Sequence, residues 1–74
     1  MNIQEKFGKR LKELRLMHSL SQEKFAQICD LDRTYINGIE NGKRNISIKN
    51  ILKITKALSV SLKDFFDTKD FYDD

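Results

Sequence analysis

The sequence predicts a compact, all-α domain of five helices. Apolar residues recur at spacings of three and four along nearly the whole chain, and the 74 residues include no proline and only three glycines. This length suits a single domain, near the lower limit at which a core is stable without a metal ion or a disulfide. No linker, internal repeat or low-complexity stretch interrupts the pattern, so we expect one folded unit.

Amphipathic spacing and capping residues predict the first two helices. The first helix is expected over Ile3–Met17. Its apolar stripe comprises Ile3, Phe7, Leu11 and Leu14. The second helix should begin after Ser21, a good N-cap, and Glu23 then falls favourably in its first turn.

The third helix should begin after Asp32, as N-cap, and end near Asn41, because Asn41 followed by Gly42 is a strong turn signal. One apolar cluster can form across the second and third helices only if the chain reverses between them. That cluster would contain Phe25, Cys29, Leu31, Ile36 and Ile39. Ala26 leaves room for the two helices to cross closely. Two short helices that meet at a tight turn are typical of the helix-turn-helix with which proteins read DNA.

Serines predict the starts of the last two helices, at Ser47 and at Ser61. The fourth helix is expected to turn inward Ile48, Ile51, Leu52, Thr55 and Leu58. In the fifth, Ser61 and Asp64 have capping-box spacing, and the apolar face comprises Leu62, Phe65 and Phe66. So short a helix in a small monomer cannot bury three large side chains, so this face is expected in a homodimer interface. Phe66 is the better interface candidate, since Leu62 or Phe65 could instead close the core.

Polar side chains are predicted on the outer face of the third helix, from a rotation of ~100° per residue. From the first turn, Arg33 would read guanine through O6 and N7. Thr34 would suit a thymine methyl or a phosphate, Asn37 an adenine edge, and Gly38 a close approach to DNA. The alternative is an ordinary solvated helix face; the preceding helix and turn favour DNA reading.

Phosphate contacts are expected around the same helix. Gln22, at the start of the second helix, would direct its amide and nearby N–H groups to phosphate, or is a plain first-turn residue. The Tyr35 hydroxyl would meet a phosphate or a base, or its ring simply packs. Lys43, Arg44 and Asn45 follow the third helix and would lie beside the DNA backbone.

Charge is distributed unevenly along the chain. Residues 1–63 carry 13 Lys or Arg and 6 Asp or Glu, a net charge of +7, whereas residues 64–74 carry Lys69 and five Asp, a net charge of −4. A basic body attracts phosphates, although an excess this small also suits a plain solvated surface. We therefore divide the chain into a DNA-binding domain, residues 1–66, and a solvated acidic tail, residues 67–74, expected away from nucleic acid.

The composition argues against an enzyme, a metal site, a cofactor or a small-molecule ligand. His18 is the only histidine, Cys29 is the only cysteine, and the acidic tail lacks the spacing of a calcium loop. Residues 1–10 carry charges with no apolar run behind them, so we expect neither a signal peptide nor a membrane span. Cys29 would be a buried thiol in a reducing cytoplasm, the expected location of this chain.

Three stretches resemble the XRE family of helix-turn-helix proteins, to which the phage Cro and cI repressors belong. They are Leu20–Ala26 (LSQEKFA), Ile39–Arg44 (IENGKR) and Ala57–Leu62 (ALSVSL). The resemblance implies a lambda-repressor-like fold and a partly buried ion pair between Arg15 and Glu40 that joins the first and third helices. It also implies DNA contacts from Gln22, Arg33, Thr34, Gly38 and Lys43. The Leu31–Tyr35 string (LDRTY) further resembles controller proteins of restriction-modification operons, which are dimeric and regulate their own operon.

The chain departs from the family where glycine is favoured, at Ser19, Asp30 and Ser59. Asp adopts a positive φ moderately well and Ser less so, so the conformations of these loops do not follow from the resemblance. Many relatives also carry a base-reading side chain where this chain has Gly38. The sequence thus predicts a sequence-specific DNA-binding regulator that acts as a homodimer on a two-fold related operator, and more specifically a controller of a restriction-modification operon. The alternative is an antitoxin-type module whose main partner is a toxin and whose DNA binding is secondary.

Overall fold

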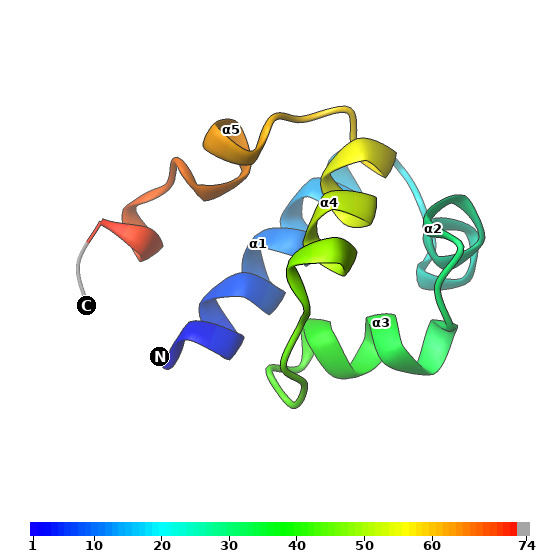
Figure 1. The fold of residues 1–74 in the computed structure, drawn as a ribbon, viewed down its shortest axis with the longest axis horizontal. Coiled ribbons are helices and arrows are strands. Elements are labelled where there is room, and N and C mark those ends of the chain that lie inside the picture. Colours follow the sequence, from blue (N-terminus) through cyan, green and yellow to red (C-terminus); the bar gives the residue numbers. More distant parts are fainter. Residues whose placement is uncertain (73–74) are drawn as a thin grey trace.

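The computed structural model describes residues 1–72, and over that range it is built from helices (Figure 1). The elements are α1 (Ile3–Met17), α2 (Gln22–Cys29), α3 (Arg33–Glu40), α4 (Ile48–Ala57), α5 (Leu62–Phe66) and a short 3-10 helix, η1 (Lys69–Phe71). The predicted all-α fold with five α-helices is confirmed. No helix within residues 1–72 is both long and apolar enough to cross a bilayer.

Side-chain caps set the helix starts. The Asn2 side chain accepts a hydrogen bond from the Glu5 N–H at 2.8 Å, and the Glu5 carboxylate accepts one from the Asn2 N–H at 2.9 Å. This reciprocal capping box begins α1. The caps predicted for the other four helices are all present, at Ser21, Asp32, Ser47 and Ser61.

The core lies where all five helices converge on one face of α1, which runs through the middle of the molecule in Figure 1. The predicted cluster of the helix-turn-helix is part of it. Phe25, Cys29, Ile36 and Ile39 are buried, and Leu31 packs against them. Ala26, which is 3% exposed, fills the crossing of α2 and α3, so the reversal inferred from the sequence is confirmed.

Three apolar residues that were predicted to face inward are exposed instead. They are Ile3, Ile48 and Leu52, which are 44–86% exposed. On α4, the buried side runs through Ile51, Ile54 and Leu58, so that Leu52 is about 100° away around the helix. Isoleucine or leucine on three sides of α4 made the inward direction ambiguous, and Ile54, fully buried, was missed.

The three loops that lack the family's glycine all adopt the left-handed conformation, with φ of 56° at Ser19, 58° at Asp30 and 56° at Ser59. In each, the N–H of the following residue donates to a carbonyl five positions earlier, at 2.9–3.2 Å. These hydrogen bonds complete Schellman-type ends of α1, α2 and α4 and hold serine and aspartate in a conformation that favours glycine.

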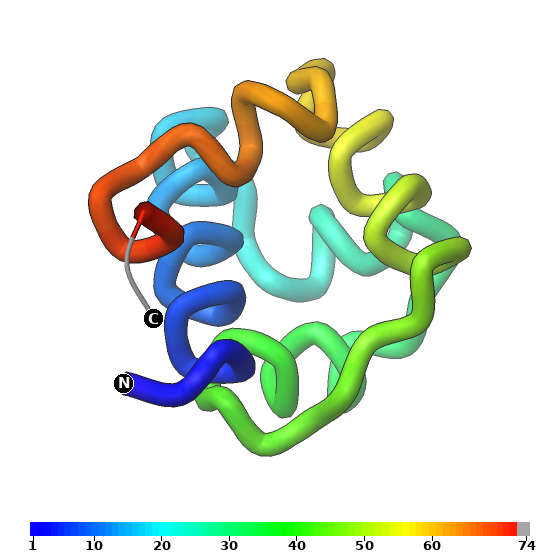
Figure 2. Tube along the Cα trace, turned by 60° about the vertical axis from the view of Figure 1, so that its left-hand side comes forward, coloured from blue at the N-terminus to red at the C-terminus, as the bar shows by residue number. Residues whose placement is uncertain are grey.

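The described part of the acidic tail packs on α1 and α5, which differs from the predicted solvated tail. Lys9 Nζ lies 3.0 Å from the Asp70 carboxylate, and the Phe71 ring contacts Phe66 edge-on at 5.0 Å. Figure 2 shows this segment, in red, beside the first half of α1. One aromatic contact and one ion pair therefore hold this segment, because the tail is not uniformly acidic. Asp73 and Asp74 lie outside the described residues.

Candidate DNA-binding surface

α3 lies along one edge of the molecule, on the side away from α5 (Figures 1 and 2). Ile36 and Ile39 anchor it in the core. Its outer face carries Arg33, Thr34, Asn37 and Asn41, which are all exposed. The polar face predicted from the sequence is therefore on the surface of the protein.

A shallow hollow of about 170 Å³ lies between the first turns of α2 and α3. It is lined by Gln22, Arg33, Thr34 and Asn37. The fold thus gathers three of the four predicted base-reading residues, with Gln22, around one concavity.

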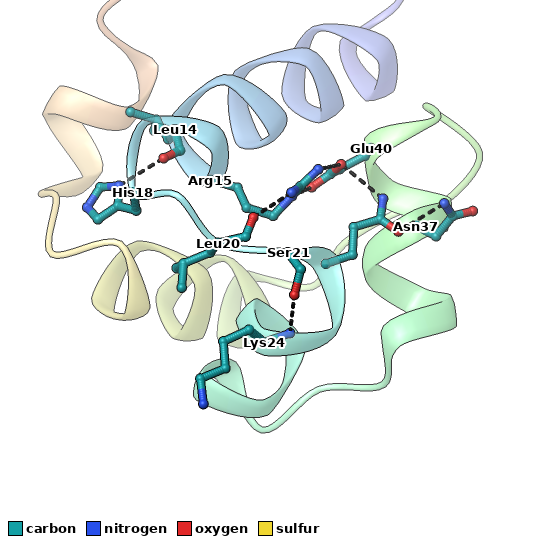
Figure 3. A network of polar contacts seen from close by, with 9 residues as sticks. Leu14, Arg15, His18, Leu20, Ser21, Lys24, Asn37 and Glu40 are labelled. Atoms are coloured by element: carbon teal, nitrogen blue, oxygen red, sulfur yellow. Dashed lines mark hydrogen bonds and ion pairs between the residues drawn. The ribbon is translucent and has the colours of Figure 1, made fainter.

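A buried ion pair fixes α3 to α1. Arg15 Nε donates to Glu40 Oε2 at 2.6 Å, Arg15 Nη2 donates to Glu40 Oε1 at 2.9 Å, and Arg15 Nη1 donates to the Leu20 carbonyl at 2.7 Å. The side chains are 7% and 2% exposed, respectively. The hydrogen bond to Glu40 raises the pKa of the Arg15 guanidinium further above its ordinary value. Figure 3 shows the two side chains pointing toward one another from α1 and α3.

The backbones of α1 and α3 also touch, at a residue that the sequence interpretation missed. A Cβ atom on Gly8 would lie 2.2 Å from the Ile39 carbonyl oxygen and 2.8 Å from that of Glu40. Only glycine fits there without movement of one helix. A usable signal was present, because glycine in a helix interior costs about 1 kcal/mol relative to alanine and so implies a compensating role.

A line of amide hydrogen bonds leads outward from this ion pair. Gln22 Nε2 donates to Glu40 Oε1 at 3.1 Å, and Asn37 Nδ2 donates to Gln22 Oε1 at 3.2 Å. Asn41 Nδ2 then donates to Asn37 Oδ1 at 3.1 Å. The Gln22 amide, predicted to face phosphate, is thus engaged at both ends by protein groups.

Gly38 makes room for another side chain of the protein rather than for DNA. A Cβ atom on Gly38 would lie 2.6 Å from Cγ of Arg44, so the Arg44 stem occupies the space that the prediction reserved for DNA. The Arg44 guanidinium carbon lies 5.0 Å from the centre of the Tyr35 ring, in a cation–π arrangement. The Tyr35 hydroxyl accepts a hydrogen bond from Asn50 Nδ2 at 3.2 Å and faces the Asn45 carbonyl at 3.5 Å. Both ends of Tyr35 therefore have partners within the protein.

The loop after α3 is held beside that helix. The Lys43 N–H donates to the Gly38 carbonyl at 2.9 Å, and the Asn45 side chain accepts a hydrogen bond from the Gln4 side chain at the start of α1. The side chains of Lys43, Arg44 and Asn45 are exposed. The loop thereby places two cationic residues next to the C-terminal end of α3.

The predicted homodimer face needs correction. Phe65 is fully buried, so it closes the core and cannot contact a second chain. Phe66 is half-buried, with ring centroids 5.0 Å from Phe65 and 6.0 Å from Phe7. Leu62 is 49% exposed. The large apolar side chains that α4 and α5 leave exposed are Ile48, Leu52 and Leu62.

An apolar groove of about 430 Å³ adjoins the half-buried side of α4. It is lined by Ile3, Gln4, Phe7, Arg44, Asn45, Ile46, Ile51 and Phe66. Because Ile51 and Phe66 belong to α4 and α5, the groove extends their apolar surface toward α1.

His18 and Cys29 have structural environments. His18 Nδ1 lies 2.8 Å from the Leu14 carbonyl, and burial raises the pKa of the Cys29 thiol to about 11. Within residues 1–72 there is no group of three or more His, Cys, Asp or Glu side chains that could hold a metal ion. The chemistry of the described surface is that of hydrogen bonding and positive charge.

This arrangement, two helices locked at a tight turn with a polar outer helix, defines a helix-turn-helix protein. The chain belongs to the helix-turn-helix family, whose model matches residues 11–65. Within that family it is similar to restriction-modification control proteins. It is 54% identical over 67 residues to Control protein C.BamHI of Bacillus amyloliquefaciens, covering 89% of this chain and 83% of the relative.

Solved structures show the same relationship. The restriction-modification controller protein C.AhdI from Aeromonas hydrophila superposes with a TM-score of 0.82 and 48% identity, over 85% of this chain and 96% of that one. A tetramer of the controller protein C.Esp1396I, in complex with its natural 35 base-pair operator, superposes with a TM-score of 0.84 and 40% identity, over 90% of this chain and 88% of that one. The predicted membership of the XRE-type family, with the controller proteins as near relatives, is confirmed.

Proposed function

We propose that this protein is a sequence-specific DNA-binding regulator of transcription that acts as a homodimer on a two-fold related operator and controls a restriction-modification operon. The observation that carries the proposal is the exposed polar face of α3, which the Arg15–Glu40 pair and the Gly8 contact hold rigidly against α1. The similarity to a controller protein solved on its operator supports it. Such a protein works in the cytoplasm and is not an enzyme.

Arg33 is the principal base-reading residue in this proposal. It is exposed in the first turn of α3, where a long guanidinium can reach O6 and N7 of guanine. Thr34 and Asn37 line the same hollow and would read neighbouring bases. Lys43, Arg44 and Asn45 would contact the phosphates beside the groove, because the loop holds them at the end of α3.

The homodimer would form through α4 and α5. Ile48, Leu52 and Leu62 are exposed there, and α3 contributes nothing to this surface, so both recognition helices stay free. Two protomers related by a two-fold axis are expected to bind half-sites about 34 Å apart, one turn of B-DNA.

The division of the chain follows the same logic. Residues 1–66 would bind DNA, and the acidic tail, residues 67–74, would stay on the far side of α1. Its described part forms an ion pair with Lys9 and an aromatic contact with Phe66, and neither residue belongs to α3. The alternative, an antitoxin-type module, has no observation in its favour among residues 1–72.

Selection of binding sites from random duplex DNA tests the function. We expect the purified protein to enrich one sequence made of two-fold related half-sites about one helical turn apart. Arg33→Ala should weaken binding to that site by about 1–3 kcal/mol and leave affinity for random DNA nearly unchanged. The control is Lys56→Ala, which also removes one exposed cation, on α4. It should change neither the affinity for the selected site nor the affinity for random DNA.

Two results would contradict this proposal. An equal loss on the selected and the random DNA would make Arg33 a phosphate ligand. Failure to enrich any sequence would remove sequence-specific binding altogether.

The dimer surface needs a separate test. Leu62→Ser should lower the dimerisation constant in sedimentation while helical circular dichroism is retained, whereas Leu16→Ser, at a similarly exposed leucine on α1, should not. Phe66→Ser is a poorer test, because that ring packs against Phe65, Phe7 and Phe71 and its loss would also loosen the core. An unchanged dimer in Leu62→Ser would exclude this face.

A further inference from the structure

The line of amide hydrogen bonds that leads outward from the ion pair starts at a group that can act only as a hydrogen-bond acceptor. The Glu40 side chain is 2% exposed, and its carboxylate can only accept. Oε2 receives Arg15 Nε, and Oε1 receives both Arg15 Nη2 and Gln22 Nε2. Gln22 must therefore turn its NH₂ group inward, toward Glu40.

The direction of this first hydrogen bond determines the direction of the next ones along the surface. With its NH₂ group turned to Glu40, Gln22 presents Oε1 to α3, so Asn37 must turn Nδ2 toward it. Asn37 then presents Oδ1 toward the end of the helix, where Asn41 donates to it from Nδ2. An isolated surface amide can exchange its oxygen and nitrogen by rotation, but here the Asn37 amide is held on both sides, by Gln22 and by Asn41. Figure 3 shows Glu40 and Asn37 on the same helix, with dashed hydrogen bonds linking them through the side chain between.

We propose that Asn41 is a further specificity-determining residue of this surface, which together with Gln22 holds the Asn37 amide in one orientation for the recognition of adenine. This inference rests on the proposed function. Asn41 acts through Asn37 and is therefore a positioning residue rather than a direct reader of the base.

The hydrogen-bonding inventory supports the choice of adenine. An amide has two N–H groups and two acceptor lone pairs. On Asn37, the hydrogen bond to Gln22 uses one N–H group and the hydrogen bond from Asn41 uses one lone pair. One donor and one acceptor remain. In the major groove, adenine presents N7 as acceptor and N6 as donor, the complement of that pair. A side chain already held in this orientation loses less conformational freedom on binding.

The experiment measures base preference rather than affinity alone. The selected operator is varied one base pair at a time, and the panel is titrated with wild type, Asn37→Leu, Asn41→Leu and the double variant. We expect each single variant to lose about tenfold of the preference for an A·T pair at the same position of the half-site. The double variant should lose no more than either single variant, because the two residues form one unit.

Two controls separate this effect from general weakening. Asn45→Leu removes another exposed asparagine beside α3 and should weaken all operators alike. Circular dichroism and the thermal midpoint should match wild type in every variant, since Asn37 and Asn41 are both exposed.

The inference is overturned if Asn41→Leu weakens every operator equally, if it alters preference at a different base pair from Asn37→Leu, or if the two losses add. Those outcomes leave the proposed function intact. If wild type itself shows no base preference, the proposed function fails instead.

Discussion

Arg15→Ala should destabilise this protein far more than the loss of an ordinary surface ion pair. The variant removes two charge-assisted hydrogen bonds to Glu40, at 2.6 and 2.9 Å, and a third to the Leu20 carbonyl at 2.7 Å. It also leaves the Glu40 carboxylate, 2% exposed in the folded protein, without its cation. The stranded charge, more than the lost hydrogen bonds, sets the size of the effect.

The structure predicts a loss of stability near the top of the usual range for single substitutions. Removal of one partner from a buried pair costs about 3–5 kcal/mol, whereas a domain of this length has a total stability of about 4–11 kcal/mol. For a domain of this size, each kcal/mol lowers the thermal midpoint by about 4–8 °C. The midpoint of Arg15→Ala should therefore fall by at least about 12 °C.

Thermal unfolding followed by circular dichroism measures the difference. Lys9→Ala, which breaks the exposed Lys9–Asp70 pair, is the matched control and should leave the midpoint close to wild type. The double variant Arg15→Met with Glu40→Leu should be more stable than Arg15→Ala, because it leaves no buried charge unpaired. A wild-type midpoint in Arg15→Ala, or a double variant less stable than the single one, would refute this account.

Three further outcomes follow from the backbone and the core. Gly8→Ala should lower the free energy of unfolding by about 1–3 kcal/mol in a denaturant titration, because its Cβ would meet the Ile39 and Glu40 carbonyls; an unchanged midpoint would mean that α1 can shift. Ser59→Gly should raise it by about 0.5–1 kcal/mol, since φ is 56° there, and a loss of stability would contradict that strain. Burial raises the pKa of the Cys29 thiol to about 11, so at pH 8 about 0.1% is thiolate and alkylation should be slow until denaturant unfolds the chain; rapid alkylation of the folded protein would show that Cys29 is accessible.

The helix starts and the reversal between α2 and α3 were predictable because they depend on local chemistry. A serine or aspartate at Ser21, Asp32, Ser47 or Ser61 satisfies backbone N–H groups within three residues, so the signal lies in a few adjacent letters. The inward side of α4 was not predictable in this way. Isoleucine and leucine surround that helix, and only its tertiary position makes Ile54 buried and Ile48 exposed.

Part of the candidate site was likewise predictable from local sequence, and part was not. The outer face of α3 follows from helical periodicity, so the exposure of Arg33, Thr34 and Asn37 was predictable. Contacts between segments that are far apart in the sequence were not predictable. The insertion of the Arg44 stem over Gly38 depends on the path of a loop, which no periodicity encodes. The packing of residues 67–72 on α1 was missed for the same reason, because charge composition suggested a solvated tail.

The Arg15–Glu40 pair has a consequence for recognition that an apolar pair would not have. Replacement of a buried ion pair by well-packed apolar side chains is often neutral or stabilising, so stability alone is a weak reason for two buried charges. The Glu40 carboxylate, however, is also the acceptor that orients Gln22, and through Gln22 the Asn37 amide on the outer face of α3. Leucine at position 40 could fill the same space but would leave the Gln22 amide free to rotate. The buried charge thus links the position of α3 to the orientation of the side chains that it presents.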